Sequence, residues 1–335
     1  MHHLITGAAG FIGSHLILRL LSDGHQVSAL DDFSLGRQSN LRGADKHPAF
    51  RIWEVDLRDQ SATSNAFRVA GKWAGASPQI VWHLAANSDI PAGVNDPEVD
   101  FGRTFLTTKS VLTAMTDTCC LRLAFASTSA VYGEHPNLLG EGSGPCLPAS
   151  NYGAAKLASE AFISAAAESR LERTWVFRFP NVVGRHATHG IIYDLIGRLK
   201  TKPESLRVLG DGTQAKPYIH VDELIEAMQF IVQNTSQSRN LYNIGPTGQS
   251  TTVRFIAESV IARVCKSNPI PIAYTGGDRG WTGDIPKFLF STDRLAQLGW
   301  MPKLTSNEAI LKAVDEIAGE MLDVEFASSE EGQAS

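Results

Sequence analysis

This chain of 335 residues lacks the features that mark several special classes of protein. No apolar run approaches the roughly 20 residues that a helix needs to span a bilayer, so we expect no membrane partner. No block of Lys and Arg occurs and the net charge is −5, which argues against nucleic acid as the main partner. Internal repeats and low-complexity segments are also absent. Hydrophobic residues make up 43% of the chain, which argues against wholesale disorder.

Cysteine is scarce, and its spacing suggests neither a disulfide framework nor a metal site. The four cysteines are Cys119, Cys120, Cys146 and Cys265. We expect the adjacent pair beside or within a buried strand as small apolar side chains. This usage is typical of a reducing compartment, so the sequence predicts a cytoplasmic protein without a bound metal.

The residues at the amino terminus predict a strand and not a targeting segment. Because Met1 leads almost directly into the first expected strand, we expect no signal peptide. His2 and His3 are too few for a metal-binding tract, and we expect them on the surface at a strand edge.

Strands and helices alternate along residues 1–180. The first expected helix covers residues 11–22, where apolar side chains recur at helical spacing. Alternation of this kind predicts a Rossmann-type, doubly wound parallel sheet with helices on both faces. The expected strands are residues 4–6, 27–30, 51–55, 80–84, 121–127 and 175–179.

The pattern changes after about residue 180. Residues 181–326 are expected to form mainly a smaller C-terminal α/β lobe that binds substrate, with some segments returning to the sheet. Asp222 is expected to cap one of its helices. The small and polar residues 327–335 are expected to form a flexible tail.

A glycine-rich turn follows the first expected strand and opens the first helix. Gly7 permits the turn, Gly10 lets backbone N–H groups approach a phosphate, and Gly13 allows close packing of helix on strand. A helix N-terminus after such a turn is a binding site for a pyrophosphate. We therefore predict a dinucleotide site that also includes Phe11 and Ile12.

Carboxylates follow the second and third strands at the positions expected for a dinucleotide. Asp31 and Asp32 lie about 20 residues beyond the glycines, where an acid binds ribose hydroxyls and repels the 2′-phosphate of NADP. NAD is therefore the expected cofactor, although Arg37 keeps NADP open. Asp56 either accepts a hydrogen bond from the adenine amino group or caps the helix that starts near Asp59.

Apolar and small residues complete the expected cofactor site. Leu57 is expected to cover the adenine ring. Leu84, Ala85 and Ala86 follow the fourth strand, where small residues let the chain pass close to the dinucleotide. His83 is expected to be a packed histidine at the strand end without a chemical role.

Tyr152 and Lys156 form the pair with the clearest chemical meaning. Four residues along a helix bring two side chains onto one face. A phenol beside a fixed ammonium becomes a base near neutral pH, because the positive charge favours phenolate. We expect Tyr152 to exchange a proton with an alcohol while a bound dinucleotide exchanges hydride. The alternative is an amphipathic pair on a solvent-facing helix.

Seven motifs, spread over nearly the whole chain, carry a resemblance to a known family. They are T-G-A-A-G-F-I-G, H-L-A-A, S-T-S-A-V-Y-G, Y-G-A-A-K, R-F-P-N-V-V-G, G-D-G-T-Q and Y-I-H-V-D. The chain resembles extended short-chain dehydrogenases/reductases of the nucleotide-sugar epimerase and dehydratase branch. The resemblance implies Thr128, Tyr152 and Lys156 as catalytic residues. It also implies a homodimer that pairs helices near residues 104–115 and 152–168.

The residues after Thr128 indicate the reaction. Dehydratases of this family place an Asp–Glu pair there, and sugar-acid decarboxylases keep the Glu. Here Ser129 and Ala130 stand instead, so we expect epimerisation at sugar C4 through a 4-keto intermediate. A net oxidoreductase of a nucleotide sugar remains an alternative, and a non-catalytic dinucleotide sensor is a remote one.

The resemblance also implies a nucleoside diphosphate sugar as substrate, with a UDP-hexose as the first candidate. Asn181 matches a residue that contacts the diphosphate, and Lys216 stands where many relatives carry Arg. Trp281 replaces the Arg of a later motif, and Arg279 is either its substitute or a surface charge. Ser127 or Ser129 is a further candidate for contact with the substrate or the cofactor.

Overall fold

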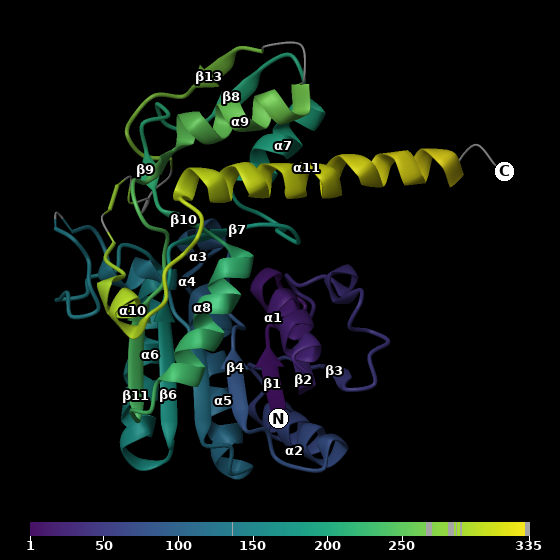
Figure 1. The fold of residues 1–335 in the computed structure, drawn as a ribbon, viewed down its shortest axis with the longest axis vertical. Coiled ribbons are helices and arrows are strands. Elements are labelled where there is room, and N and C mark those ends of the chain that lie inside the picture. Colours follow the sequence, from purple (N-terminus) through teal and green to yellow (C-terminus); the bar gives the residue numbers. More distant parts are fainter. Residues whose placement is uncertain (136, 266–269, 281–284, 286, 289, 332–335) are drawn as a thin grey trace. The chain divides into compact units, whose positions relative to one another are not determined.

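The computed structural model describes residues 1–135, 137–265, 270–280, 285, 287, 288 and 290–331, with side chains described as far as Leu322. The chain divides into two compact units (Figure 1). The first comprises Met1–Phe179, Ile225–Ile244 and Ser291–Trp300. The second comprises Pro180–Leu224, Gly245–Phe290 and Met301–Ser335.

The first unit is built on a parallel sheet of seven strands flanked by helices (Figure 1). Its strand order is β11-β6-β5-β4-β1-β2-β3, and every pairing is parallel. The order reverses at β1, which pairs β2 on one side and β4 on the other, so the sheet is doubly wound as expected. The strands are β1 (His2–Thr6), β2 (Gln26–Asp31), β3 (Phe50–Glu54), β4 (Ile80–His83), β5 (Arg122–Ala126), β6 (Arg173–Arg178) and β11 (Arg239–Asn243).

Helices α2 (Gln60–Ala74), α5 (Thr107–Asp117) and α6 (Asn151–Ser169) share one apolar core with strand side chains such as Leu4 and Phe125. Helix α1 (Phe11–Ser22) is linked to α8 (Val221–Asn234) by a hydrogen bond of 3.0 Å from Gln229 to Asp23. The remaining elements of this unit are η1 (Gln38–Leu41), α3 (Ile90–Asn95), α4 (Pro97–Asp100), the π-helix η2 (Phe101–Leu106), η3 (Ser129–Tyr132) and α10 (Asp293–Leu298).

The second unit packs three helices around its own core. Buried apolar residues of α7 (Ile191–Thr201), α9 (Val253–Cys265) and α11 (Ser306–Glu331) form this core. Its strands pair two by two: β7 (Asn181–Val183) with β10 (Tyr218–His220), β8 (Leu206–Val208) with β13 (Ile272–Tyr274), and β9 (Ala215–Lys216) with β12 (Thr251–Thr252).

The first helix and six strands lie where the sequence predicted them, with strand ends that differ by two residues at most. Residues 327–331 continue α11, and the flexible tail over residues 327–335 stays a prediction. Two expectations about other segments were wrong. Asp222 lies inside the first turn of α8. Cys120 is buried but Cys119 is exposed, in a turn with φ 54° just before β5.

The expectation that His2 and His3 lie on the surface was also wrong, because both rings are buried and each takes part in at least one hydrogen bond in the interior. They are 5% and 3% exposed. The His2 ring lies 2.8 Å from Ser28 Oγ and 2.9 Å from the Ala76 carbonyl oxygen. The His3 ring accepts a hydrogen bond of 3.0 Å from Trp82 Nε1. Burial lowers the pKa of His3 to about 3, so its ring is neutral at neutral pH.

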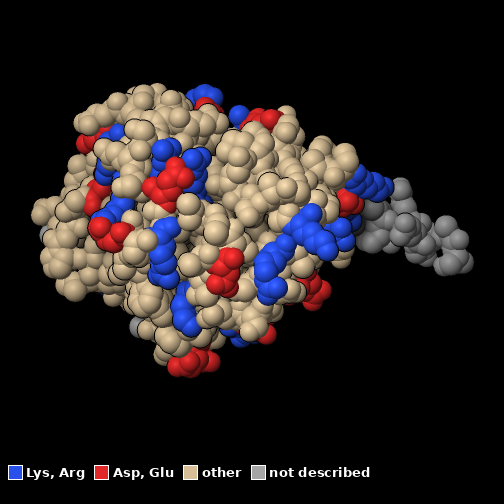
Figure 2. All heavy atoms as spheres, turned by 90° about the horizontal axis from the view of Figure 1, so that it is seen from below, with Lys and Arg blue, Asp and Glu red and all other residues tan. Residues whose placement is uncertain are grey.

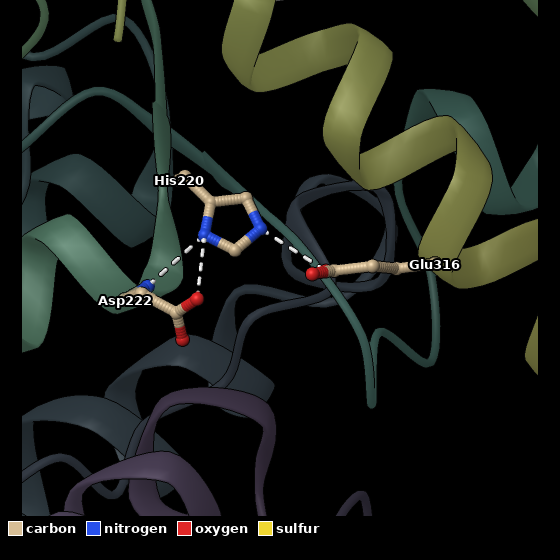
Figure 3. A group of neighbouring side chains, drawn as sticks. All are labelled: His220, Asp222 and Glu316. Atoms are coloured by element: carbon tan, nitrogen blue, oxygen red, sulfur yellow. Dashed lines mark hydrogen bonds and ion pairs between the residues drawn. The ribbon is translucent and has the colours of Figure 1, made fainter. Parts of the chain in front are cut away.

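A charged cluster joins α11 to the end of β10 in the second unit (Figure 3). His220 Nε2 lies 3.0 Å from Glu316 Oε2, and its Nδ1 lies 3.4 Å from Asp222 Oδ2. The three side chains are spaced closely enough to hold a metal ion. However, the Lys312 ammonium already donates to Asp222 at 2.7 Å, so a protein cation pairs with this carboxylate. We interpret the cluster as structural.

This cluster makes stability depend on pH. Burial alone would lower the pKa of His220, but the hydrogen bonds and charges of Asp222 and Glu316 raise it above the ordinary value. A raised folded-state pKa gives stability that is complete below the unfolded pKa and is lost as pH rises through the folded pKa. Each unit of pKa difference is worth about 1.4 kcal/mol. We therefore expect the free-energy gap between wild type and His220→Gln to be largest near about pH 6 and to shrink towards about pH 9.

Urea unfolding at several pH values measures this gap. His189→Gln, at an exposed histidine of the same unit, is the matched control and should leave the pH dependence unchanged. A gap for His220→Gln that is constant with pH would contradict the prediction.

The surface carries charges of both signs. On the face drawn in Figure 2, Lys and Arg side chains lie beside Asp and Glu side chains, and other residues cover most of the area. This mixture fits the small net charge of −5. None of the helices in the described part of the chain combines the length and apolar character needed to cross a bilayer.

Candidate active site

The predicted cofactor residues lie where the parallel strands of the first unit end. The glycine turn follows β1, which lies at the point where the strand order reverses. Ligands of open α/β sheets bind at such switch points, beyond the carboxyl ends of the strands. The residues that follow β2, β3 and β4 lie at this same edge of the sheet.

The glycine turn has no room for side chains. Gly7 has φ 68°, and a Cβ there would lie 2.7 Å from the Ala85 backbone nitrogen. A Cβ on Gly13 would lie 2.2 Å from the Gly7 carbonyl oxygen. Gly10 is the N-cap of α1, whose first turn begins at Phe11 and Ile12. The backbone therefore approaches the space in front of the helix without side chains, which fits the pyrophosphate of NAD.

Asp31 supports the glycine turn, and its contact with a ribose stays a prediction. Its carboxylate accepts hydrogen bonds of 2.8 Å from the backbone N–H groups of Ala9 and Phe33. Burial raises the pKa of Asp31, and these two bonds oppose the rise. Asp32 instead accepts from the Ser34 backbone at 3.0 Å and from the Ser34 hydroxyl at 2.6 Å. Both carboxylates thus hold the loop after β2.

The cap of α2 is Asp59, which accepts a hydrogen bond of 2.9 Å from the Ala62 backbone. The alternative in which Asp56 caps this helix was therefore wrong. Asp56 forms a bidentate ion pair with Arg58, whose Nη2 lies 2.7 Å from its Oδ2. Leu57 is 5% exposed and packs in the core beside α2. An adenine contact of Asp56 and Leu57 stays a prediction.

The segment after β4 passes directly against the glycine turn. Its Leu84 and Ala85 backbone atoms are the nearest neighbours of Gly7, and Leu84, Ala85 and Ala86 are all partly exposed. His83 is fully buried, and its ring nitrogens lie 2.7 Å from Thr6 Oγ1 and 3.0 Å from Thr108 Oγ1. Burial lowers the pKa of His83 to about 3.

Helix α6 places Tyr152 and Lys156 one turn apart. Ser150 caps the helix by accepting a hydrogen bond of 3.1 Å from the Gly153 backbone. Gly153 lets the helix approach η3 closely, because a Cβ there would lie 2.7 Å from the Ala130 carbonyl oxygen. This contact brings the start of α6 to the turn that follows Thr128.

Lys156 is 2% exposed and directed at the end of β5. Its Nζ donates a hydrogen bond of 2.6 Å to the Ala126 carbonyl oxygen and lies 6.0 Å from the Tyr152 ring centroid. Burial lowers the pKa of Lys156 to about 7, and the Glu160 charge acts in the opposite direction.

The expectation that Lys156 lowers the pKa of Tyr152 is not met in this structure. Burial raises the pKa of Tyr152, the hydrogen bond with Thr128 opposes the rise, and the charge of Asp100 adds to it. Desolvation disfavours the phenolate, and Lys156 shares the same buried surroundings. Tyr152 is therefore a neutral phenol at neutral pH here, in contact with the Thr128 hydroxyl.

Thr128 and Ser129 follow β5 at the same edge. Thr128 is the N-cap of η3, where its hydroxyl accepts a hydrogen bond of 3.1 Å from the Ala130 backbone. The Ser129 backbone donates a hydrogen bond of 3.0 Å to the Phe179 carbonyl oxygen. Thr128, Tyr152 and Lys156 thus converge around the end of β5.

Two acids beside this site, Asp100 and Glu160, were not predicted from the sequence. Asp100 is 1% exposed, accepts a hydrogen bond of 2.8 Å from Asn87, and keeps its Oδ2 without a hydrogen-bond partner among the described residues. Thr104 lies in the π-helix η2 and accepts from the Asn87 backbone at 3.1 Å. Glu160 lies four residues beyond Lys156, and this helical spacing is the signal that could have identified it.

The predicted substrate residues lie on separate segments of the second unit. Asn181 opens β7 and is exposed, Lys216 ends β9 and is partly exposed, and Arg279 is exposed. The motif that begins at Trp281, residues 281–284, lies outside the described residues.

The sequence and the fold of the chain are similar to those of known proteins. Residues 3–245 match the model of the NAD dependent epimerase/dehydratase family. The chain is 29% identical to the UDP-glucose 4-epimerase of Mycolicibacterium smegmatis over 94% of this chain and 98% of the relative. It is 31% identical to the Thermus thermophilus UDP-glucose 4-epimerase solved in complex with NAD, with a TM-score of 0.80 over 95% of this chain and 99% of that chain. A crystal structure of a UDP-galactose 4-epimerase gives 30% identity and a TM-score of 0.82, covering 96% of this chain and all (100%) of the other.

Proposed function

The chain belongs to the NAD-dependent epimerase/dehydratase family, and we propose that it inverts C4 of a nucleotide sugar through a 4-keto intermediate. The observation that carries this proposal is the convergence of Thr128, Tyr152 and Lys156 at the sheet edge that also holds the glycine turn. The named relatives and solved structures support the same reaction class.

In the proposed mechanism each residue has a separate role. Tyr152 takes the proton of the sugar 4-hydroxyl and later returns it. Thr128 donates a hydrogen bond to the same oxygen, which keeps that oxygen beside the phenol. Lys156 would orient the nicotinamide ribose, and its charge, when the amine is protonated, favours the phenolate. NAD, when bound, supplies the hydride acceptor and donor. Gly7, Gly10 and Gly13 leave space for its pyrophosphate at the start of α1, where the first N–H groups of the helix, at Phe11 and Ile12, would bind it.

The two residues that follow Thr128 favour epimerisation over dehydration. Ser129 and Ala130 begin η3 and provide no carboxyl group. Elimination of water from a sugar needs an acid and a base in these positions, and a hydroxyl with a methyl group cannot replace them.

The first candidate substrate is a UDP-hexose. The relatives named as UDP-glucose 4-epimerases support UDP as the nucleotide. In this proposal Asn181, Lys216 and Arg279 of the second unit bind the diphosphate, and Ser129 contacts the sugar. Lys216 supplies charge but lacks the bidentate fork of Arg.

A screen of UDP-, dTDP-, GDP- and CDP-sugars for thermal stabilisation tests the substrate. Proton NMR on the best binder then follows the configuration at C4. Interconversion of the two C4 epimers without net NADH supports the epimerase. Steady accumulation of NADH with excess NAD would instead identify a net dehydrogenase.

We also propose a homodimer in the reducing cytoplasm. An aromatic patch made of Phe101, Phe105 and Phe162 supports the dimer. Phe101 and Phe162 are 48% and 50% exposed, and the Phe105 ring lies 5.7 Å and 4.9 Å from their centroids. Contiguous exposed aromatic side chains mark interaction sites. The four cysteines stand as free thiols, which suits a reducing compartment.

Replacing Phe162 should weaken the dimer. A two-fold interface contains each residue twice, so Phe162→Lys removes two apolar contacts and should raise the dimer dissociation constant roughly 100-fold or more. Light scattering at micromolar concentration measures the mass. Leu138→Lys is the matched control, because Leu138 is 54% exposed but lies outside the aromatic patch. A wild type that is already monomeric would refute the dimer.

A further inference from the structure

A buried ion pair lies one helical turn beyond Lys156. Glu160 of α6 accepts hydrogen bonds from Arg178 Nε at 3.0 Å and from Arg178 Nη2 at 2.5 Å. The two side chains are only 10% and 7% exposed. Replacing a buried pair of this kind by apolar residues is often neutral or stabilising. Its presence beside the catalytic residues therefore points to a role other than stability.

Two hydrogen bonds, one to Glu160 and one from Lys156, attach α6 to the end of β5. The Ser127 hydroxyl donates to Glu160, and Lys156 Nζ donates to the Ala126 carbonyl oxygen at 2.6 Å. Two consecutive residues of the chain are thus attached to two successive turns of α6. Thr128 is the next residue, so its position relative to α6 depends on both attachments.

The charges around Lys156 give Glu160 a second effect. Burial lowers the pKa of Lys156 to about 7, and the Glu160 charge raises it. The other titratable groups that face Lys156 are His83 of β4, whose pKa of about 3 keeps it neutral, and the phenol of Tyr152. Arg178 of β6 lies beyond the Glu160 carboxylate, with its guanidinium carbon 4.7 Å from the Tyr132 ring centroid.

We propose that Glu160 is a positioning residue that keeps Lys156 charged and holds the end of β5, which carries Thr128, against α6. This inference rests on the proposed function, because it concerns the ammonium that would bind the nicotinamide ribose. Arg178 fixes the carboxylate in place by its bidentate contact.

The pH dependence of NAD affinity tests this inference without any turnover. Calorimetric titration of the full-length protein with NAD should show affinity falling as Lys156 loses its proton. Glu160→Gln keeps the shape of the side chain and removes its charge, so NAD affinity should begin to fall at a lower pH than in wild type. Arg178→Lys keeps a charged pair and is the matched control. In this variant NAD affinity should fall at the same pH as in wild type.

A second variant covers the case in which Glu160→Gln fails to fold because Arg178 is left unpaired. The double variant Glu160→Gln/Arg178→Gln leaves neither member of the buried pair uncompensated and should shift the pH dependence in the same direction, by less, because loss of the Arg178 charge partly offsets loss of the Glu160 charge. A purely structural Glu160 would lower NAD affinity equally at every pH, and that result would overturn the inference. A wild-type protein that does not bind NAD would refute the proposed function instead.

Discussion

Replacing Tyr152 with Phe is expected to abolish epimerisation while leaving the protein folded and able to bind NAD. The change removes one oxygen atom and keeps the ring that faces Lys156. General acid–base catalysis typically accelerates a reaction roughly 100- to 10,000-fold, so the turnover rate should fall at least roughly 100-fold. Proton NMR of C4 epimerisation measures turnover, and calorimetric titration with NAD measures binding.

Tyr132→Phe is the matched control for this prediction. Tyr132 is a second buried tyrosine of the same unit, and its hydroxyl donates a hydrogen bond of 2.8 Å to Asn243. Losing that bond should lower the free energy of unfolding by about 1 to 3 kcal/mol and leave epimerisation much less affected. A Tyr152→Phe protein that keeps more than roughly a tenth of wild-type turnover would show that another group moves the proton.

The state of Tyr152 in this structure sharpens the same prediction. Burial raises the pKa of the phenol, so Tyr152 is protonated in this structure and is not yet a base. A phenolate forms only if positive charge is brought beside it, and Lys156, with a pKa of about 7, is partly neutral itself. Whatever keeps Lys156 charged is therefore part of the catalytic requirement, which is why the Glu160 carboxylate matters.

The sequence predicts those parts of the molecule whose signals are local. The glycine turn, the first helix and the alternation of apolar strands need only neighbouring residues, and the structure has them within two residues. Strand β11 was not predicted, because two of its five residues, Asn240 and Asn243, are polar yet buried. Asn243 donates to the Leu139 and Ser291 carbonyl oxygens, partners that lie far away in the sequence.

The same limit explains the errors about His2 and about the electrostatics of the site. His2 is buried because Ser28 and Ala76 satisfy its ring, and nothing near it in the sequence indicates these partners. The electrostatics of Tyr152 and Lys156 depend on how completely the surrounding elements exclude water. A spacing of four residues predicts that the two side chains share a helix face, but it cannot predict the direction of either pKa shift.

Replacing Gly13 with Ala is expected to destroy NAD binding by a purely steric route. The backbone of Gly13 is helical, so alanine itself is acceptable there. Its Cβ, however, would lie 2.2 Å from the Gly7 carbonyl oxygen and 2.9 Å from Ala8 Cα. Both neighbours are backbone atoms, which cannot rotate away as a side chain would. Either α1 or the turn must move, and the N–H groups that would bind the pyrophosphate move with it.

We expect NAD affinity to fall at least roughly 100-fold, which corresponds to about 2.7 kcal/mol. Gly71→Ala is the matched control in helix α2 of the same unit, where the nearest atoms to a new Cβ are 3.6 Å away. That change should leave NAD binding unaltered and stabilise the fold by about 0.5 to 1 kcal/mol, because Ala favours a helix over Gly. Circular dichroism confirms that both variants are folded before NAD is added. If Gly13→Ala bound NAD like wild type, the glycine turn would not be the pyrophosphate site, and the cofactor would have to bind elsewhere along the sheet edge.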